Sequence, residues 1–523
     1  MSEKKFEKNT VLCCVIFTVY AVLTFIGAVN HELWFDEAQA WVIARDNNIS
    51  GIFHQLGYEG HPPLWYLILY VPSHLGVPCT IMPYISWFLT AAAGAVIMFR
   101  SPFNIVTRSA VLFSGGFLFL NSVISRVYCL INIMIVLFVC LYPKRKKYPI
   151  LYGLLIGLLA NTHICISGFI GMIGIFMIID LFKEFKSNSV KQNIKEIIGL
   201  AIAGIGVLMM VIPLLDSLSL NSSTSEMSFS AIVFISSFFE SFINVSRAVI
   251  NYGVEFGGPL AGLFGILGYI FSGFMAAAFV IMIIMMRHKT RPFFMLLVFW
   301  LCYTITTEVF WLTIPNRALI FTAMFFMIAW IAEYEPQNNA AEIWSKFKLN
   351  TDTKSIKKLL EFIKSSDKGF KKSYTAMITV IMLISVPMGA YYLFSDYTRT
   401  FCPAEITAEY IRENLPEDSV FVTNNESCAE ISAYLPGYKF YSSNYGRFYT
   451  YYTHENISYD VDYSQIYNDL KDYDDLYYIY ICPDIEYLTS NRKIIHVIRD
   501  GMPYGTNTRY VEIAEYDLNN LEA

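Results

Sequence analysis

Residues 30–66 read NHELWFDEAQAWVIARDNNISGIFHQLGYEGHPPLWY and lie between two strongly apolar parts of the chain. The segment gathers several ionisable side chains: Asp36, Glu37, Arg45, Glu59 and His61. Ionisable groups next to lipid are costly unless they are solvated, paired with one another or used in function. The segment therefore predicts an active-site loop at a membrane surface.

The composition of the whole chain is that of a polytopic membrane protein. Of its 523 residues, 55% are hydrophobic, and the mean hydropathy is +0.45. Soluble domains rarely sustain such values over this length. The net charge of -5 is unevenly divided, because residues 401–523 carry 21 acidic and 8 basic residues. We therefore expect the two parts of the chain to face different environments.

About eleven apolar stretches are long enough to cross the ~30 Å hydrocarbon core of a bilayer. They are residues 11–29, 80–99, 109–124, 127–142, 149–162, 164–182, 194–215, 259–286, 292–309, 318–333 and 373–394. The first is longer than the apolar core of a signal peptide, so we expect a retained helix. Residues 64–76 are short and aromatic, which favours an interfacial helix.

The basic residues predict the orientation of the helices. With a cytoplasmic N-terminus, every inner loop is enriched in Lys or Arg: 100–108, 143–147, 183–195, 287–291 and 334–372. The outer loops before residue 395 hold only scattered basic residues: Arg45, Arg126, Arg247 and Arg317. This asymmetry is the positive-inside pattern. It predicts that loop 30–79 and residues 395–523 share the non-cytoplasmic side of a cell membrane.

The predicted fold is an α-helical polytopic membrane domain followed by a soluble α/β domain. Residues 1–394 form the membrane domain, with an outer catalytic loop at 30–79, a second large outer loop at 216–258 and a cytoplasmic linker at 334–372. Residues 395–523 form the extracytoplasmic domain, because helices and strands alternate there. We expect helices at 403–414 and 426–435, and strands at 419–424, 438–441, 476–482, 494–499 and 509–516.

Asp36 and Glu37 begin an apparent helix, DEAQAWVIARD. Acidic residues at a helix N-terminus often cap free N–H groups and complement the helix dipole, which is a purely structural explanation. A carboxylate at a membrane surface can instead accept a proton from a hydroxyl or amine. The HPP turn at 61–63 and the next apolar segment follow this pair, and that context favours catalysis.

These motifs resemble the GT-C superfamily of membrane glycosyltransferases, closest to the branch shared by protein O-mannosyltransferases and bacterial aminoarabinose transferases. The matching motifs are LWFDEAQAWVIARD at 33–46, GHPPLWYLIL at 60–69, SRVY at 125–128, NTH at 161–163 and PNR at 315–317. The resemblance spans residues 10–335. It implies transfer of a sugar from a polyprenyl-phosphate carrier, generally with inversion, to an acceptor glycan, lipid or protein outside the cytoplasm.

The resemblance also implies roles for single residues. Asp36 matches the catalytic base and Glu37 its partner. His61, Arg126 and Arg317 match positions suited to the donor phosphate. A structural explanation for the two arginines is interfacial anchoring, in which a long side chain reaches from apolar surroundings to water.

Three further residues are expected to support the site: Tyr128, His163 and Glu59. For His163, a hydrogen bond at a helix end is the alternative. Some relatives bind a metal ion through a carboxylate and a histidine, but Glu59 and His61 do not match that set cleanly. A divalent metal cation is therefore the one cofactor left open. His31, His54 and His74 receive no role.

Two other functions use the same sequence features. A transporter or flippase of a lipid-linked sugar would need the arginines but no base, and its paired halves are not visible in the sequence. A surface receptor or assembly factor would not need eleven spans. The chain has no GxGxxG after a strand, no P-loop and no HExxH motif, which argues against nucleotide-driven transport and zincin chemistry. The basic loops suit membrane lipid and predict no nucleic-acid partner.

Overall fold

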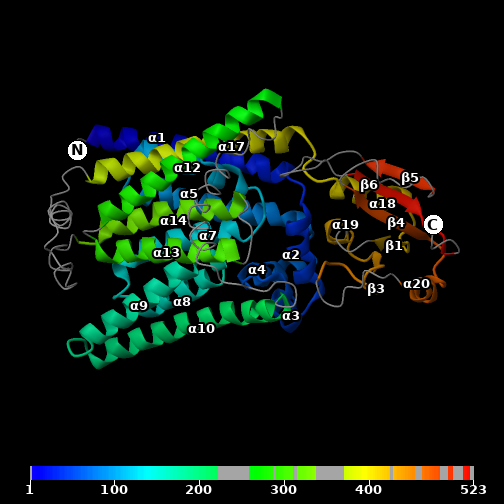
Figure 1. Ribbon diagram of the computed structural model, residues 1–523, viewed down its shortest axis with the longest axis horizontal. Helices are drawn as coiled ribbons and strands as arrows, with labels where there is room; N and C mark the ends of the chain where they lie inside the picture. Colours follow the sequence, from blue (N-terminus) through cyan, green and yellow to red (C-terminus); the bar gives the residue numbers. More distant parts are fainter. Residues whose placement is uncertain are drawn as a thin grey trace.

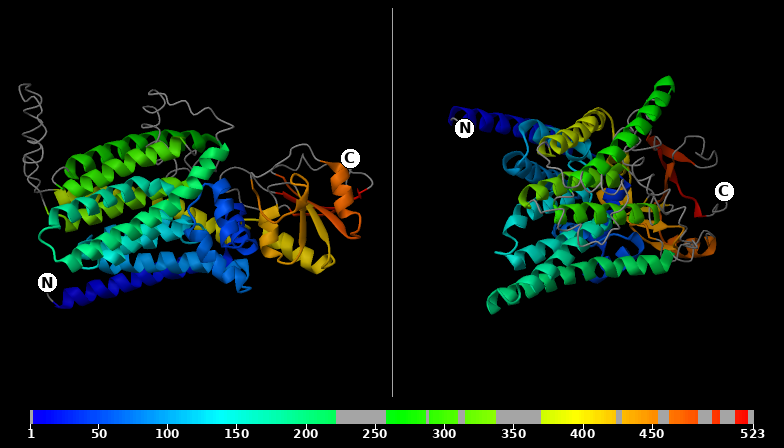
Figure 2. Two further views of the ribbon diagram at one scale, coloured as in Figure 1. Left: turned by 90° about the horizontal axis from the view of Figure 1, so that it is seen from below. Right: turned by 60° about the vertical axis from the view of Figure 1, so that its left-hand side comes forward.

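The computed structural model describes residues 3–221, 258–286, 289–309, 315–336, 370–423, 428–453, 462–482, 493–498 and 510–518. A body of long helices occupies one end of the elongated molecule, and a β-sheet occupies the other (Figure 1). Short helices drawn in blue lie between them, as both Figure 1 and the left view of Figure 2 show. The predicted outer loop at 216–258 and inner linker at 334–372 lie mostly outside the described residues.

The long helices run side by side along the body (Figure 1). They are α1 (Glu3–Asn30), α5 (Met82–Arg100), α7 (Tyr128–Leu141), α8 (Pro149–Ala160), α9 (Ser167–Glu184), α10 (Val190–Asn221), α12 (Gly258–Met286), α13 (Thr290–Val309), α14 (Pro315–Tyr334) and α17 (Phe370–Thr398). Among the described residues, five stretches are long and apolar enough to cross a membrane: Asn9–Asn30, Cys79–Arg100, Ile164–Glu184, Val190–Pro213 and Tyr374–Thr398. The membrane-spanning class is confirmed, whereas the count of eleven spans stays a prediction.

One predicted span, 109–124, is not a continuous helix. Helix α6 (Ile105–Leu112) ends there, and a π-helical turn, η2 (Gly116–Leu120), follows. The cause is close backbone packing against α17, since a Cβ atom on Gly389 would lie 2.8 Å from Cα of Gly115. The backbone N–H of Gly115 also donates to Oγ of Ser385 at 3.2 Å. Contacts with a distant helix therefore replace regular helical hydrogen bonding here.

Helices α8 and α10 pack through glycines. A Cβ atom on Gly153 would overlap the carbonyl oxygen of Gly199, and one on Gly206 would overlap Gly157. Small residues spaced along apolar helices allow such close approach of two backbones. At the end of α8, the amide of Asn161 donates to the carbonyls of Gly157 (2.8 Å) and Gly206 (2.7 Å). This packing fixes the segment that follows α8.

The quoted segment folds into α2 (Phe35–Asp46), α3 (Ile49–Glu59) and the turn before α4 (Leu64–His74). Asn48 caps α3 by accepting the N–H of Gly51 at 2.8 Å. Gly60 ends α3 with φ 66°, a left-handed conformation that suits glycine. The predicted helix at 64–76 is confirmed, and its interfacial position stays a prediction.

The C-terminal part holds a six-stranded sheet in the order β3-β2-β1-β4-β6-β5. The strands are β1 (Val420–Thr423), β2 (Lys439–Ser442), β3 (Arg447–Phe448), β4 (Leu476–Cys482), β5 (Ile494–Ile498) and β6 (Tyr510–Glu515). Strand β1 is parallel to β2 and β4, and the remaining pairs are antiparallel. Every residue of β1 is buried, as expected for the centre of a parallel region.

Three described helices accompany the sheet: α18 (Ala404–Asn414), α19 (Cys428–Tyr434) and α20 (Tyr463–Leu470). The predicted α/β alternation agrees with these elements. Strand β3 and helix α20, only two and eight residues long, were not predicted from the sequence.

Candidate active site

The site begins where α1 passes into α2. Asp36 and Glu37 occupy the first turn of α2, but their side chains take different directions. Oδ2 of Asp36 lies 2.6 Å from Nη1 of Arg126, and the Asp36 side chain is 31% exposed. Glu37 is completely buried. Adjacent residues on a helix point about 100° apart, so one carboxylate faces the opening while the other faces the interior.

A small pocket with a cavity volume of about 20 Å³ lies beside the Asp36–Arg126 pair. It forms where α2, the HPP turn, the start of α4 and the loops before α7 and after α8 meet. Its lining residues are Asp36, Ala40, His61, Pro62, Trp65, Tyr66, Arg126, Val127 and Thr162. Three of the predicted site residues, Asp36, His61 and Arg126, therefore converge although up to 90 positions separate them in the sequence.

Aromatic rings surround the guanidinium of Arg126. Its Cζ lies 6.0 Å from the ring centroid of Trp34 and 5.5 Å from that of Tyr128. Rings at this distance attract a cation through their negative faces. Burial alone would lower the pKa of Arg126, but the nearby carboxylate of Asp36 raises it, so the arginine stays charged. Tyr128 therefore contacts Arg126, and its supporting role in the site stays a prediction.

His163 lies behind the pocket. Its ring centroid is 6.2 Å from that of His61 and 5.7 Å from that of Tyr128. Nδ1 of His163 accepts the N–H of Cys165 at 3.2 Å, which is the helix-end bond named as its structural alternative. A supporting role in the site stays a prediction.

Glu59 lies close to the pair without touching the pocket. Its Oε1 accepts a hydrogen bond from Nε2 of Gln39 at 2.8 Å. Burial and, to a smaller extent, the charge of Asp36 raise the pKa of Glu59 to about 7 against the opposing effects of Gln39 and Arg126. The Gln39 side chain also bonds the carbonyl (2.6 Å) and the N–H (2.9 Å) of Tyr452, which ties the sheet region to α2.

Glu37 contacts three neighbouring segments inside the protein. Oε2 accepts the N–H of Trp34 at 3.2 Å, and Oε1 accepts the N–H of Ser125. Oε2 also lies 2.9 Å from Nε2 of His31. Since both carboxylate oxygens have partners inside the protein, this geometry favours a positioning role over the predicted catalytic one, which stays a prediction.

The structure adds residues that the sequence analysis did not single out. Trp65, Tyr66 and Thr162 line the pocket, and the WY that follows HPP and the T of NTH are the signals that mark them. His31 and Asp396 join Glu37 in a buried cluster. No local pattern marks these two, because 365 positions separate them.

The structure describes the backbone of Arg317 but not its side chain. Arg317 lies in the first turn of α14. Within the described ranges, no three His, Cys, Asp or Glu side chains form a group able to hold a metal ion. The divalent metal cation left open by the sequence stays a prediction.

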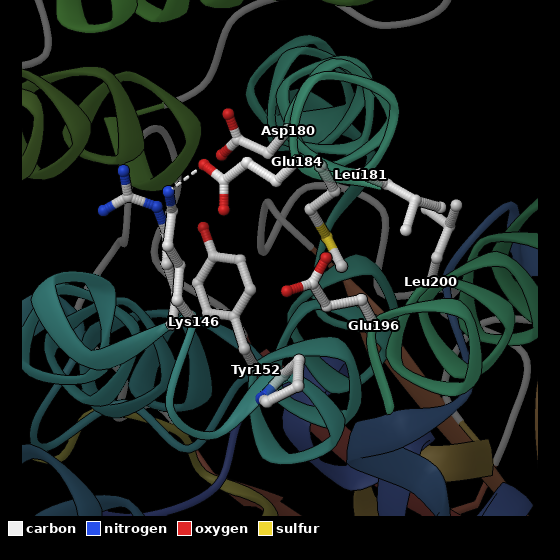
Figure 3. Close-up of a pocket in the computed structure, with 10 residues that line it drawn as sticks. Lys146, Tyr152, Asp180, Leu181, Glu184, Glu196 and Leu200 are labelled. Atoms are coloured by element: carbon white, nitrogen blue, oxygen red, sulfur yellow. Dashed lines mark hydrogen bonds and ion pairs between the residues drawn. The ribbon is translucent and has the colours of Figure 1, made fainter. Parts of the chain in front are cut away.

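A second pocket lies between α8, α9 and α10 (Figure 3). In it, Lys146 pairs with Glu184, and Tyr152, Asp180 and Glu196 point toward the same space. None of its lining residues belongs to the predicted site. It lies beside the predicted inner loops at 143–147 and 183–195, and we call this part of the helical body the basic end.

Comparison with solved structures finds ArnT from Cupriavidus metallidurans. Its apo crystal structure matches with a TM-score of 0.50 and 12% identity, over 96% of this chain and 98% of that chain. The structure of ArnT bound to undecaprenyl phosphate matches with a TM-score of 0.49 and 11% identity, over 97% and 99%. A scan of family models and a search of curated proteins find no match. The chain thus shares the overall fold of ArnT and contains apolar helices long enough to cross a membrane.

Proposed function

We propose that this protein is an integral-membrane glycosyltransferase that moves a sugar from a polyprenyl-phosphate donor to an acceptor outside the cytoplasm. The observation that carries the proposal is the Asp36–Arg126 pair, 2.6 Å apart, at the wall of a pocket in a GT-C-like fold. ArnT, which shares this fold, has been crystallised with undecaprenyl phosphate, so that lipid is the first carrier to test.

In this proposal, Arg126 holds the donor phosphate. A guanidinium has five N–H donors, so one carboxylate oxygen does not exhaust its bonding capacity. Its planar fork fits phosphate oxygens, and the aromatic walls of Trp34 and Tyr128 fix its direction. As the bond between the sugar and the phosphate breaks, the phosphate gains negative charge next to this cation. Stabilising charge that develops in the transition state is a major source of catalysis.

Asp36 serves as the base. The acceptor oxygen or nitrogen attacks the anomeric carbon of the sugar on the face opposite the phosphate, and its proton passes to the Asp36 carboxylate. The new bond forms as the bond to phosphate breaks, so the sugar is transferred with inversion and polyprenyl phosphate leaves. The partial exposure of Asp36 allows an acceptor to reach it. His61 and Tyr66, which line the same pocket, orient the sugar or the phosphate in this proposal.

Transfer measured in lipid nanodiscs tests the proposal. Full-length protein would be supplied with undecaprenyl-phosphate-linked, radiolabelled sugars and a membrane extract as acceptor. We expect Asp36→Asn to lower the rate by about 10²–10⁴-fold, the usual contribution of a general base. The matched control is Asp46→Asn at the other end of α2, which we expect to keep most of the activity.

The outcomes separate the alternatives. If Asp36→Asn keeps the full rate, Asp36 has no part in the mechanism. If the wild-type protein forms no product but moves the labelled lipid across the bilayer, the protein is a flippase or transporter.

A further inference from the structure

A buried histidine joins three segments behind the proposed site. His31 follows the end of α1, and its Nε2 lies 2.9 Å from Oε2 of Glu37 on α2. Its Nδ1 lies 3.0 Å from Oδ1 of Asp396, near the end of α17. All three side chains are 0% exposed. A ring with a carboxylate on each nitrogen is held on both sides, so it fixes the relative position of the helix ends.

The charge state of this cluster supports the same conclusion. Burial alone would lower the pKa of His31, but the carboxylates of Glu37 and Asp396 outweigh it and raise the pKa well above its ordinary value. The imidazolium form has an N–H on both nitrogens and can donate to both carboxylates. Without that cation, two carboxylates would share an interior that has no water to solvate them, which is strongly unfavourable.

Glu37 passes this constraint on to the two residues of the proposed chemistry. It receives the N–H of Trp34, at the start of the helix that presents Asp36. It also receives the N–H of Ser125, the residue immediately before Arg126. The Glu37 carboxylate therefore fixes the two backbone segments that carry Asp36 and Arg126.

Glu32 and Leu33, which follow His31, are also hydrogen-bonded to distant parts of the chain. The N–H of Phe401 donates to Oε2 of Glu32 at 2.7 Å, and the N–H of Leu33 donates to the hydroxyl of Tyr434 at 2.7 Å. The start of the site is thus attached to the segment that follows α17 and to α19, through residues 369 and 401 positions further along the chain.

We propose that His31 and Asp396 are positioning residues for the Asp36–Arg126 pair, acting through Glu37 and the backbone N–H of Ser125. The reaction that they serve rests on the proposed function above. The positioning itself does not, because it concerns contacts within the protein. Neither residue touches the pocket, so the inference assigns them no direct contact with substrate.

The first test needs no turnover. Hydrogen–deuterium exchange of full-length protein in nanodiscs would be read on peptides that cover residues 121–128. We expect His31→Gln to speed exchange at Ser125 by about tenfold or more, because its acceptor Glu37 loses its fixed orientation. The control His74→Gln, an exposed histidine on α4, should leave exchange as in the wild type. Folded His31→Gln protein with unchanged exchange would overturn the proposal.

The second test reads the effect on the reaction. A misplacement of about 1 Å can cost about 100-fold in rate, so we expect a loss of that order in His31→Gln. The His31→Gln/Glu37→Gln double variant should lose no more than Glu37→Gln alone, because both changes act through one carboxylate. Additive losses would contradict action through Glu37.

A pH profile separates misplacement from a smaller folded fraction, which would only scale the profile. A carboxylate that loses a neighbouring arginine binds its proton more tightly. We therefore expect the acid limb of the profile to move to higher pH in His31→Gln and to stay in place in His74→Gln. The ionisable groups facing the site are Arg126, Glu59, His61 and Tyr66, and those facing His31 are Glu32, Glu37, Asp396 and Glu405.

If His31→Gln fails to fold, Asp396→Asn replaces it, because asparagine keeps an oxygen that can accept from Nδ1. The expected result is then a smaller increase in Ser125 exchange, and unchanged exchange overturns the proposal. If the wild-type protein transfers no sugar, the proposed function fails, while the exchange experiment still decides whether His31 and Asp396 set the Ser125 loop.

Discussion

At the basic end of the helical body, Lys146 pairs with Glu184, and Arg291 pairs with Asp180. These side chains are 18–54% exposed, so water solvates each partner as well. The turn between α9 and α10, which lies near Glu184, is at the same end of the body as the N-terminus (Figure 1). The Lys146–Glu184 pair joins the loops at 143–147 and 183–195, and the side of the membrane on which these loops lie stays a prediction.

At the opposite end, the charges are buried or half-buried. The His31–Glu37–Asp396 cluster has no exposure, and Arg126 is 12% exposed. If one of the ion pairs in this cluster is lost, water cannot solvate the remaining charge. The two ends use the same residue types, but only the second makes each charge depend on the position of the others. Full burial therefore distinguishes the His31–Glu37–Asp396 cluster from the basic end, whereas the exposure of Asp36 and Arg126 overlaps that of Arg291 and Asp180.

The largest contrast is expected from two arginines. Arg126→Gln should lower sugar transfer by about 10²–10³-fold, because the departing phosphate loses its cation. Arg291→Gln, at the basic end, should stay within about twofold of the wild type. Initial rates of the reconstituted protein measure both. Equal losses would remove the functional distinction between the two ends.

Stability should differ between two aspartates. Asp396→Asn weakens a fully buried ion pair and is expected to lower the free energy of unfolding by about 3 kcal/mol. Asp180→Asn breaks a partly solvated pair and should cost about 1 kcal/mol or less. Reversible unfolding in mixed micelles, followed by tryptophan fluorescence, measures both. A larger loss for Asp180→Asn would contradict our account of burial.

The pH dependence of stability should report Glu59. Its pKa is about 7 in the folded protein against an ordinary value of 4.5, so the folded state keeps a proton that the unfolded state releases. Stability from this group is therefore lost as pH rises from about 5 to 8. In Glu59→Gln, the midpoint of thermal unfolding should fall less over this range. Glu184→Gln, at the basic end, should keep the wild-type slope, and a flat wild-type curve would contradict the assignment.

The smallest effect is expected from Lys146→Gln. Its partner Glu184 is 31% exposed, and exposed ion pairs contribute little to stability. The free energy of unfolding should therefore change by about 0.5 kcal/mol or less. Transfer should be unaffected. A clear loss of transfer would show that the pocket at the basic end takes part in function.

Much of the fold could be predicted because its signals are local. Apolar stretches gave the long helices, and alternating patterns gave the elements of the sheet region. The break at 109–124 could not be predicted, since its cause is the approach of Gly115 to Gly389, more than 270 positions away. Of the candidate site, Asp36, His61 and Arg126 were identified from short motifs, and the structure brings them together.

By itself, the sequence determined that the chain is a helical membrane protein with an acidic α/β region, and it marked the DE pair and the HPP turn. These properties follow from composition and short-range periodicity, which every part of the chain carries locally. Only the tertiary structure decided that Asp36 faces a pocket while Glu37 faces His31 and Asp396. The physical reason is that burial and charge pairing depend on which distant segments meet, and neighbouring residues do not encode that meeting.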